Sequence, residues 1–492
     1  MSQINTDASF EELPVEIVES IVQLLDVADI GSLRLASRPL NSKATQGHFR
    51  SFFFSKRVKV NSCQLEKLEF ITKHGFLGCQ IRDLTLVGLV YDTKGLKAAV
   101  RRHPEDSEKQ HDLKELSEQE VDYEDSRDSG LIVRLLGNAF RNIAAKSRAG
   151  KLHSLSLEVA VYRLDAQNES RPSEGENWQP VWQGAAETFH TVFSSLRESW
   201  VRVDDLNIFN EPYLQQCSIA SNELSSVISC TDGLSHTLES LRSLSISMSA
   251  PIVNFSQFSD GWAHKSDSFN AEDNEESEED EETRITRLVT KAYHEKNFNS
   301  FGDLVAACRN LKSLEIHQYS VNRSWAHIRV PIPMHRLFQH GIGTLVTLPP
   351  IEECSLNGVF LRESDILGFL QKSTNSLRRL SMKTVTMVKG SYVAVFDHIA
   401  RKTPNLDYLY LDELRLKYEW IHFTGVGDPK FNTWEGAHGG NTLTREGKEE
   451  AQQPIPYHLP TGGRLPYSTP SYHEWLQAQR LEYGPHPRSF EI

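Results

Sequence analysis

The feature that most constrains how this 492-residue chain can fold is a short apolar pattern, Leu-x-x-Leu-x-Leu or a close variant, which recurs eight times between residues 58 and 416. The alternation in its last three positions predicts a short strand with one buried face. Segments with helical apolar spacing, such as 129–147 and 363–375, lie between these strands. One strand and one helix cannot bury their apolar faces alone, whereas copies stacked in register can. The central apolar residues of the eight segments are Leu84, Leu155, Leu206, Leu244, Leu314, Cys354, Leu380 and Leu409.

This pattern resembles an irregular leucine-rich-repeat array. The last repeats are the most regular, since 26 residues separate Cys354 from Leu380 and 29 separate Leu380 from Leu409. Earlier gaps reach 70 residues, between Leu244 and Leu314, and the Asn or Cys position typical of the family is mostly absent. The resemblance implies a curved solenoid over residues 56–417 whose strands line a concave, macromolecule-binding surface. The alternative is a non-repetitive α/β domain in which the matches arise by chance.

Polar residues between the apolar positions of the repeats are candidates for contact with a bound protein. Those selected as substrate-binding residues are Arg242, Lys312, Arg378, Arg379 and Tyr408. Because arginine binds carboxylate and phosphate groups bidentately, this set favours a basic surface that prefers an acidic or phosphorylated ligand. The alternative is a set of ordinary solvated lysines and arginines.

The N-terminal residues 11–55 predict three short helices. Pro14 marks the start of the first, because a proline in the first helical turn gives up no hydrogen bond. Asp29 is expected to cap the second helix and Ser37 the third. The core of such a module is very small, which suits a module that is completed by binding a partner. A stripe of apolar residues on the first helix consists of Ile17, Ile21, Leu24 and Leu25, and Val18 and Val22 form a second stripe.

These residues are similar to the F-box. The pattern reads Leu13-Pro14-x-Glu16-Ile17, Ile21, Leu25, Asp29-Ile30, Leu33-Arg34 and Ala36-Ser37-Arg38. Leu40 stands where the family usually has a bulky aromatic residue, and residues 48–60 are similar to the segment that comes after the F-box in many fungal members of the family. The alternative is an ordinary helical cap on a larger fold.

The resemblance implies a docking surface for the Skp-type linker subunit of a cullin–RING ubiquitin ligase. The residues that it assigns to this surface are Leu13, Pro14, Ile17, Ile21, Leu25, Leu33 and Leu40. The chain is then a substrate-recognition adaptor without an enzymatic activity of its own, and the repeat array binds a target protein for ubiquitination. Two alternatives remain: a structural scaffold or F-box protein with a non-degradative role, and a hydrolase with an unrecognised site.

The net charge of −13 is concentrated in two segments. Residues 104–128 contain eleven acidic and three basic residues, and nine of the eleven residues in 272–282 are acidic. Runs of like charge with little apolar surface predict disorder, so 104–128 and 264–284 are interpreted as disordered insertions. Ser277, which precedes five acidic residues, is a candidate phosphorylation site. Because the excess charge is acidic, no nucleic-acid partner is expected.

Other signals point to a cytoplasmic and/or nuclear protein. The six cysteines are widely spaced, which predicts reduced thiols and no metal site. No phosphate-binding loop, dinucleotide-binding motif, zinc-protease motif or nucleophile elbow is present, so no cofactor is expected. Residues 1–10 lack the character of a signal peptide and are predicted to be disordered, and no run of 18 apolar residues predicts a membrane span.

The segment 418–492 is rich in Gly, Pro and aromatic residues and predicts little regular structure beyond a short helix near residues 473–483. It is interpreted as a tail that either caps the array or holds a partner. The predicted fold class is therefore α+β: a three-helix F-box, then an irregular α/β leucine-rich-repeat-like solenoid with disordered acidic insertions, then this tail.

Overall fold

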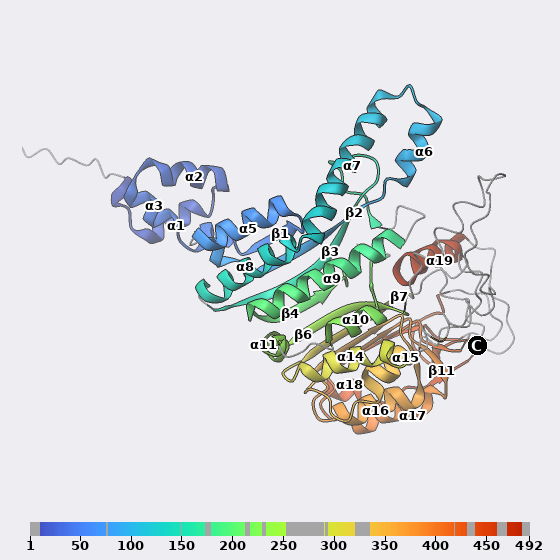
Figure 1. Cartoon of the computed structure of the whole chain (residues 1–492). Coiled ribbons are helices and arrows are strands. Elements are labelled where there is room, and N and C mark those ends of the chain that lie inside the picture. The colour runs from blue at the N-terminus through green and yellow to red at the C-terminus, as the bar shows by residue number, and fades with distance from the viewer. Residues whose placement is uncertain are drawn as a thin grey trace, which may run out of the picture.

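The computed structural model describes residues 10–74, 77–147, 149–172, 179–211, 217–228, 233–251, 290, 294–319, 335–417, 419–430, 438–459 and 470–484. Ser277, the insertion 264–284 and residues 1–9 lie outside these ranges, so the predictions made for them stay predictions. The described chain is a mixed α/β protein built on a large, mostly parallel sheet (Figure 1). None of its described helices combines the length and apolar character needed to cross a bilayer.

The main sheet follows the order of the chain. Its neighbouring strands are β1 (Ser55–Lys59), β2 (Asp83–Tyr91), β3 (Lys151–Tyr162), β4 (Arg202–Ile208), β6 (Ser243–Ser249), β7 (Ser313–Tyr319), β8 (Glu353–Asn357), β10 (Arg379–Lys383), β12 (Tyr408–Asp412) and β16 (Thr442–Glu446). All of these pairings are parallel except that of β12 with β16. The short β5 (Ile219–Ala220) pairs with β6.

The eight predicted repeat strands are confirmed, and they are stacked in register. Leu84 pairs with Leu155, Leu155 with Leu206, and Leu206 with Leu244. The row continues through Leu314, Cys354, Leu380 and Leu409. All eight side chains are buried in one continuous core. A shift of one residue would turn each strand's apolar side chains to the other face, so this row fixes the register of the sheet.

Helices cover one face of the sheet (Figure 1). They are α5 (Ser62–His74), α8 (Leu131–Lys146), α9 (Gln179–Ser199), α10 (Ser221–Ile228), α11 (Ser235–Ser240), α14 (Lys296–Ala307), α15 (His335–Phe338), α16 (Glu363–Ser373) and α17 (Tyr392–Lys402), with short turns at Gly78–Gln80 and Gln339–Gly343. Their apolar faces join the same core as the strands.

Tight turns after three strands of the main sheet lead into a second, four-stranded sheet. This second sheet contains β9 (Phe360–Arg362), β11 (Thr386–Lys389), β13 (Arg415–Leu416) and β14 (Glu419–Trp420). One residue after β8, β10 and β12, the backbone takes positive φ values, at Gly358 (68°), Thr384 (54°) and Glu413 (50°). Such a conformation costs energy for residues with a side chain, so Thr384 and Glu413 require support from their surroundings.

The prediction of disorder for residues 104–128 is wrong. They contain the helix α7 (Ser107–Asp128), which projects from the sheet beside α6 (Lys94–Arg102) (Figure 1). Leu116 and Tyr123 are buried in the main core, and Arg127 forms a 2.9 Å ion pair with Glu187 of α9. The acidic composition concealed these few anchors, because most of the carboxylates lie on the exposed face of the helix.

The N-terminal residues form four helices instead of the predicted three. They are α1 (Val15–Val22), α2 (Val27–Ala36), α3 (Arg38–Ala44) and α4 (Gly47–Ser51), preceded by a turn at Phe10–Glu12. The predicted third helix is divided between α3 and α4. Ser37 caps α3 as expected, with its hydroxyl 3.3 Å from the amide nitrogen of Leu40. The cap of α2 is Asp26, not Asp29, since the Asp26 carboxylate accepts a 2.8 Å hydrogen bond from the Asp29 amide.

The C-terminal segment is more regular than its composition indicates. β16 covers the edge of β12, while β15 (His422–Phe423) pairs with β17 (Tyr457–His458). The helices α18 (Lys448–Ala451) and α19 (Pro470–Tyr483) follow, and α19 includes the predicted short helix. In Figure 1, α19 lies near the ends of the central strands, away from the helices that cover the sheet.

Candidate functional site

The helices α1–α4 form a module with a core of its own, separate from that of the sheet. The buried residues of this small core are Val18, Val22, Ile30, Ala44 and Phe49. Five buried side chains give little burial free energy for a folded unit, because each of the four larger ones contributes about 1.5–3 kcal/mol when fully buried and the Ala44 methyl group contributes less. A partner that covers more of the module's apolar surface would therefore add to its stability.

A lysine fixes the segment that leads into α1. The ammonium of Lys43 donates hydrogen bonds to the carbonyl oxygens of Glu11 and Leu13, at 2.6 and 2.7 Å. Pro14 then takes an extended conformation, with φ −52° and ψ 149°, and α1 begins at the next residue. Pro14 is exposed, as predicted, whereas Leu13 is half-buried against the small core. Sequence reasoning missed Lys43, which no motif signals.

The structure divides the predicted linker-binding residues into exposed and packed ones. Ile17 is 48% exposed, but Ile21, Leu25 and Leu33 are only partly exposed. Leu25 and Leu33 pack against the small core. Leu40 is 5% exposed, so it supports the module from inside and offers no contact surface.

Two leucines that were not assigned to the linker-binding surface are the most exposed apolar residues of the module. Leu24 is 86% exposed and Leu35 is 90% exposed. Leu24 lies in the turn that follows α1, seven residues after Ile17, and Leu35 lies eight residues after Val27 on α2. Helical spacing places Leu24 on the apolar stripe of the first helix, and the same spacing could have indicated Leu35.

The predicted substrate-binding residues lie side by side at the amino ends of neighbouring strands. The Lys312 amide donates to the Arg242 carbonyl at 2.8 Å, and Arg379 is paired in register with Tyr408. The guanidinium of Arg379 also lies over the Tyr408 ring, 4.2 Å from its centroid. Arg378 is exposed on the same row. The structure therefore brings this set together along one edge.

The expected basic character of this edge is wrong, because carboxylates alternate with the cations. Glu352 pairs with Lys312 at 2.7 Å and lies 3.9 Å from Arg378, while Glu353 lies 4.0 Å from Arg379. The hydrogen bond from Lys312 lowers the pKa of Glu352, so the acid stays ionised. Glu352 and Glu353 stand in their Leu-x-x-Leu-x-Leu segment where Arg378 and Arg379 stand in theirs. The sequence pattern therefore already indicated that acids share this edge with the cations.

A second acidic pair balances the other half of the edge. Asp204 pairs with Lys151, and Asp205 lies 3.6 Å from the His153 imidazole. Burial raises the pKa of Asp205 above its usual value, although the charges of His153 and Arg242 oppose this rise. The edge formed by the amino ends of these strands thus carries cations and carboxylates that pair with one another.

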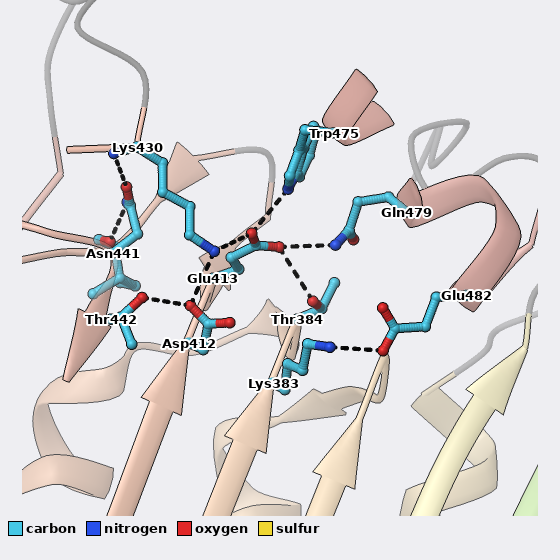
Figure 2. Close-up of polar contacts among 11 residues, drawn as sticks. Lys383, Thr384, Asp412, Glu413, Lys430, Asn441, Thr442, Trp475, Gln479 and Glu482 are labelled. Atoms are coloured by element: carbon cyan, nitrogen blue, oxygen red, sulfur yellow. Dashed lines mark hydrogen bonds and ion pairs between the residues drawn. The ribbon is translucent and has the colours of Figure 1, made fainter. Parts of the chain in front are cut away.

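At the opposite, carboxyl end of the strands, polar groups from β12, the C-terminal segment and α19 meet (Figure 2). Glu413, which follows β12, has a side chain only 2% exposed. Its carboxylate accepts hydrogen bonds from Trp475 at 2.8 Å, Gln479 at 3.0 Å and Thr384 at 3.4 Å. Lys430 pairs with it at 2.5 Å, so the buried charge is compensated.

Asp412 forms the second acid of this cluster. Its carboxylate accepts hydrogen bonds from Thr442 at 2.6 Å and from Lys430 at 3.2 Å. Lys430 thus bridges two adjacent carboxylates, and these contacts raise the pKa of Lys430 although burial lowers it. The cluster is saturated by cations and donors and holds the C-terminal segment in place.

The described residues contain no group of three or more His, Cys, Asp or Glu side chains arranged to hold a metal ion. Burial raises the pKa of Cys308 to about 12 and also raises those of Cys217 and Cys354. These thiols therefore stay protonated at neutral pH and are poor nucleophiles.

No protein-family model matches the chain, and a search of curated proteins finds no match either.

Proposed function

We propose that this protein is a non-enzymatic, substrate-recruiting subunit of an SCF-type ubiquitin ligase. In this proposal α1–α4 are the F-box and dock the Skp-type linker subunit, through which the cullin and RING subunits are held. The stacked strands are a leucine-rich-repeat-like array that binds a target protein. Ubiquitin transfer then occurs on partner subunits, because holding the target beside them raises its effective concentration.

The observation that carries the proposal is the concentration of exposed apolar side chains on the smallest folded unit. Seven of the fifteen large apolar side chains that are exposed in the described residues lie between Phe10 and Phe52. Apolar surface gathered in this way marks protein–protein interaction sites. Anchors such as Ile17 and Leu24 are of the kind that contribute most of the binding free energy at an interface. The Leu13-Pro14 segment resembles the start of an F-box and is fixed ahead of them by Lys43.

The register of the main sheet supports the second half of the proposal. The central apolar residues of eight segments, far apart in sequence, form one buried row. A common register across adjacent strands is what stacked copies of one pattern predict. A stacked array of this kind presents the polar face of its strands to a partner.

Co-purification with a Skp-type linker subunit tests the proposal. The full chain should retain the linker subunit and, with it, the cullin and RING subunits. The double variant Pro14→Ala/Ile17→Ala should lose all three, whereas Val346→Ala should keep them, because Val346 is 91% exposed but lies far along the chain from the module. If the wild-type chain does not retain the linker subunit, the proposal is wrong. If the complex forms but deleting the protein changes no other protein's half-life, its role is non-degradative.

A further inference from the structure

We propose that α19 is an intramolecular ligand, and that the surface on which it lies accepts a helix of the same chemistry from a partner protein. We call this surface the α19-docking surface and define it by His317, Gly358, Lys383, Glu413 and Trp420. It lies at the carboxyl ends of β7, β8, β10 and β12, together with Trp420 of β14. Figure 2 shows Lys383 and Glu413 of this surface facing α19. The inference does not depend on linker-subunit binding by α1–α4.

The contacting face of α19 has the composition of an interface more than that of a core. Tyr472, Gln479 and Tyr483 are buried and Trp475 is partly exposed, and their spacing of three and four residues places them on one side of the helix. This face carries three aromatic rings and an amide, and its one aliphatic side chain, Leu476, is half-buried beside them. Aromatic residues with polar ends are enriched at separable interfaces, where each must function in the presence and absence of the partner.

Glu413 recognises two donors spaced by one helical turn. Trp475 Nε1 and Gln479 Nε2 donate to different carboxylate oxygens of Glu413, at 2.8 and 3.0 Å. Lys430 and Thr384 come from outside α19 and stay beside the carboxylate if the helix leaves. The charge of Glu413 is therefore compensated with or without α19, and water can replace the two lost donors. A partner helix needs two N–H donors at i and i+4 to make the same contacts.

The Trp475 ring packs against the Trp420 ring and the Arg415 guanidinium. Its ring lies 5.0 Å from the ring of Trp420 in an edge-to-face arrangement. The guanidinium of Arg415 is 5.6 Å from the Trp420 ring and 5.7 Å from the Trp475 ring. Edge-to-face pairs and cations over an indole ring both favour tryptophan at this position over an aliphatic residue.

The C-terminal end of α19 packs against Gly358 through Tyr483. A Cβ atom on Gly358 would lie 2.4 Å from Cδ1 of Tyr483 and 2.8 Å from the Gln318 carbonyl oxygen. Only a residue without a side chain leaves room for the tyrosine. Next to it, Lys383 pairs with Glu482 at 2.7 Å. The surface thus selects an acidic residue followed by tyrosine, seven and eight positions after the tryptophan.

The length of chain between α19 and the strand pair β15–β17 sets how strongly α19 competes with a partner helix. Residues 460–469 join it to the strand pair β15–β17, and a chain of that length spans up to roughly 33 Å when extended. A helix tethered by such a segment has an effective concentration in the millimolar range, on the order of 1 mM. A partner helix must therefore compete with α19, and free peptide should bind the wild-type chain weakly.

Fluorescence anisotropy with a labelled peptide of residues 470–484 tests this proposal on the full chain. We expect weak binding to the wild-type chain. The variant Trp475→Ala/Gln479→Ala weakens the tethered helix and should bind the wild-type peptide at least about tenfold more tightly, because hydrogen bonds to a charged acceptor are among the strong ones. Adding Glu413→Gln on the docking surface should abolish that gain. A peptide that carries the same two alanines is the matched control and should not bind.

Two results would overturn the proposal. One is that the Trp475→Ala/Gln479→Ala chain binds the peptide no better than the wild-type chain. The other is that Glu413→Gln leaves peptide binding unchanged. If the double variant does not fold, as judged by circular dichroism, Tyr483→Ala replaces it, since this change releases α19 at the Gly358 end. Retention of the Skp-type linker subunit by each variant is measured alongside, and its loss would concern α1–α4 and not the docking surface.

Discussion

Two adjacent leucines allow the binding surface of the N-terminal module to be separated from its core. Leu24 is 86% exposed at the end of α1, whereas Leu25 is half-buried and packs against the small core. The two residues are chemically identical and neighbours in sequence, so replacing either by alanine removes the same atoms. Any difference between the variants must come from the surroundings of the side chain.

The structure gives the size of both effects. Leu24→Ala removes roughly three carbon groups that only a partner can cover, at about 0.8 kcal/mol each, so binding should weaken by about 2 kcal/mol, or ~30-fold in Kd. The stability of the free chain should change by less than about 0.5 kcal/mol. Leu25→Ala should instead destabilise the module by about 1–3 kcal/mol, because it opens a space in a core of few residues.

Isothermal titration calorimetry with the purified Skp-type linker subunit measures the affinity, and hydrogen exchange of the α1–α4 amides measures the stability. The Val346→Ala variant controls for the loss of an exposed apolar side chain elsewhere. An unchanged Kd for Leu24→Ala, with the wild-type chain binding normally, would show that this stripe of α1 is not the docking surface. Faster exchange in Leu24→Ala than in Leu25→Ala would contradict the assigned burial.

Three further predictions concern other parts of the molecule. Leu116→Ala should cost about 2–4 kcal/mol and speed hydrogen exchange throughout α7, whereas Val121→Ala, at an exposed position of the same helix, should change neither. Lys43→Met should weaken linker-subunit binding by about three- to tenfold by releasing the Leu13 carbonyl, with the α1–α4 core still protected from exchange. Burial lowers the pKa of His317 to about 4. The docked state of α19 is therefore fully favoured above about pH 6.5 and loses stability as the pH falls from there towards 4. Tryptophan fluorescence followed across this range should show the loss of docking in the wild-type chain and a smaller loss in His317→Gln.

The strands of the repeats could be predicted from sequence because their signal is local and repeated. The alternation around Leu380 or Leu409 defines a strand with one buried face, and each repeat adds the same information. The register then follows, since stacked copies of one pattern bury their leucines only when they are aligned.

The helix α7 could not be predicted, because its stability depends on contacts with distant segments. Leu116 and Tyr123 are two apolar anchors among many charges, and Arg127 forms an ion pair with Glu187, sixty residues further along the chain. Composition alone assigns such a segment to disorder. Burial against α8 and β2 is what overrides it.

The candidate sites show the same division. The pattern around Leu13 and Pro14 drew attention to the segment that leads into α1, but it assigned Leu25 and Leu40 to a docking surface, whereas both pack inside the module. Which side of a short helix faces the core depends on the helices packed against it. The contacts of Glu413 with Trp475 and Gln479 join residues more than sixty positions apart, so no local pattern contains them.

The antiparallel pairing of β16 with β12 has a consequence for aggregation. A strand at the edge of a sheet exposes unpaired backbone groups on which another chain can build. The sequence of β12, Tyr-Leu-Tyr-Leu-Asp, would be a hazardous edge because it carries no cation. β16 covers it with a strand that ends in Arg445 and Glu446, and at the opposite edge β1 carries three cations in five residues. Both edge strands of the main sheet thus carry charged side chains, which disfavours edge-to-edge pairing between molecules.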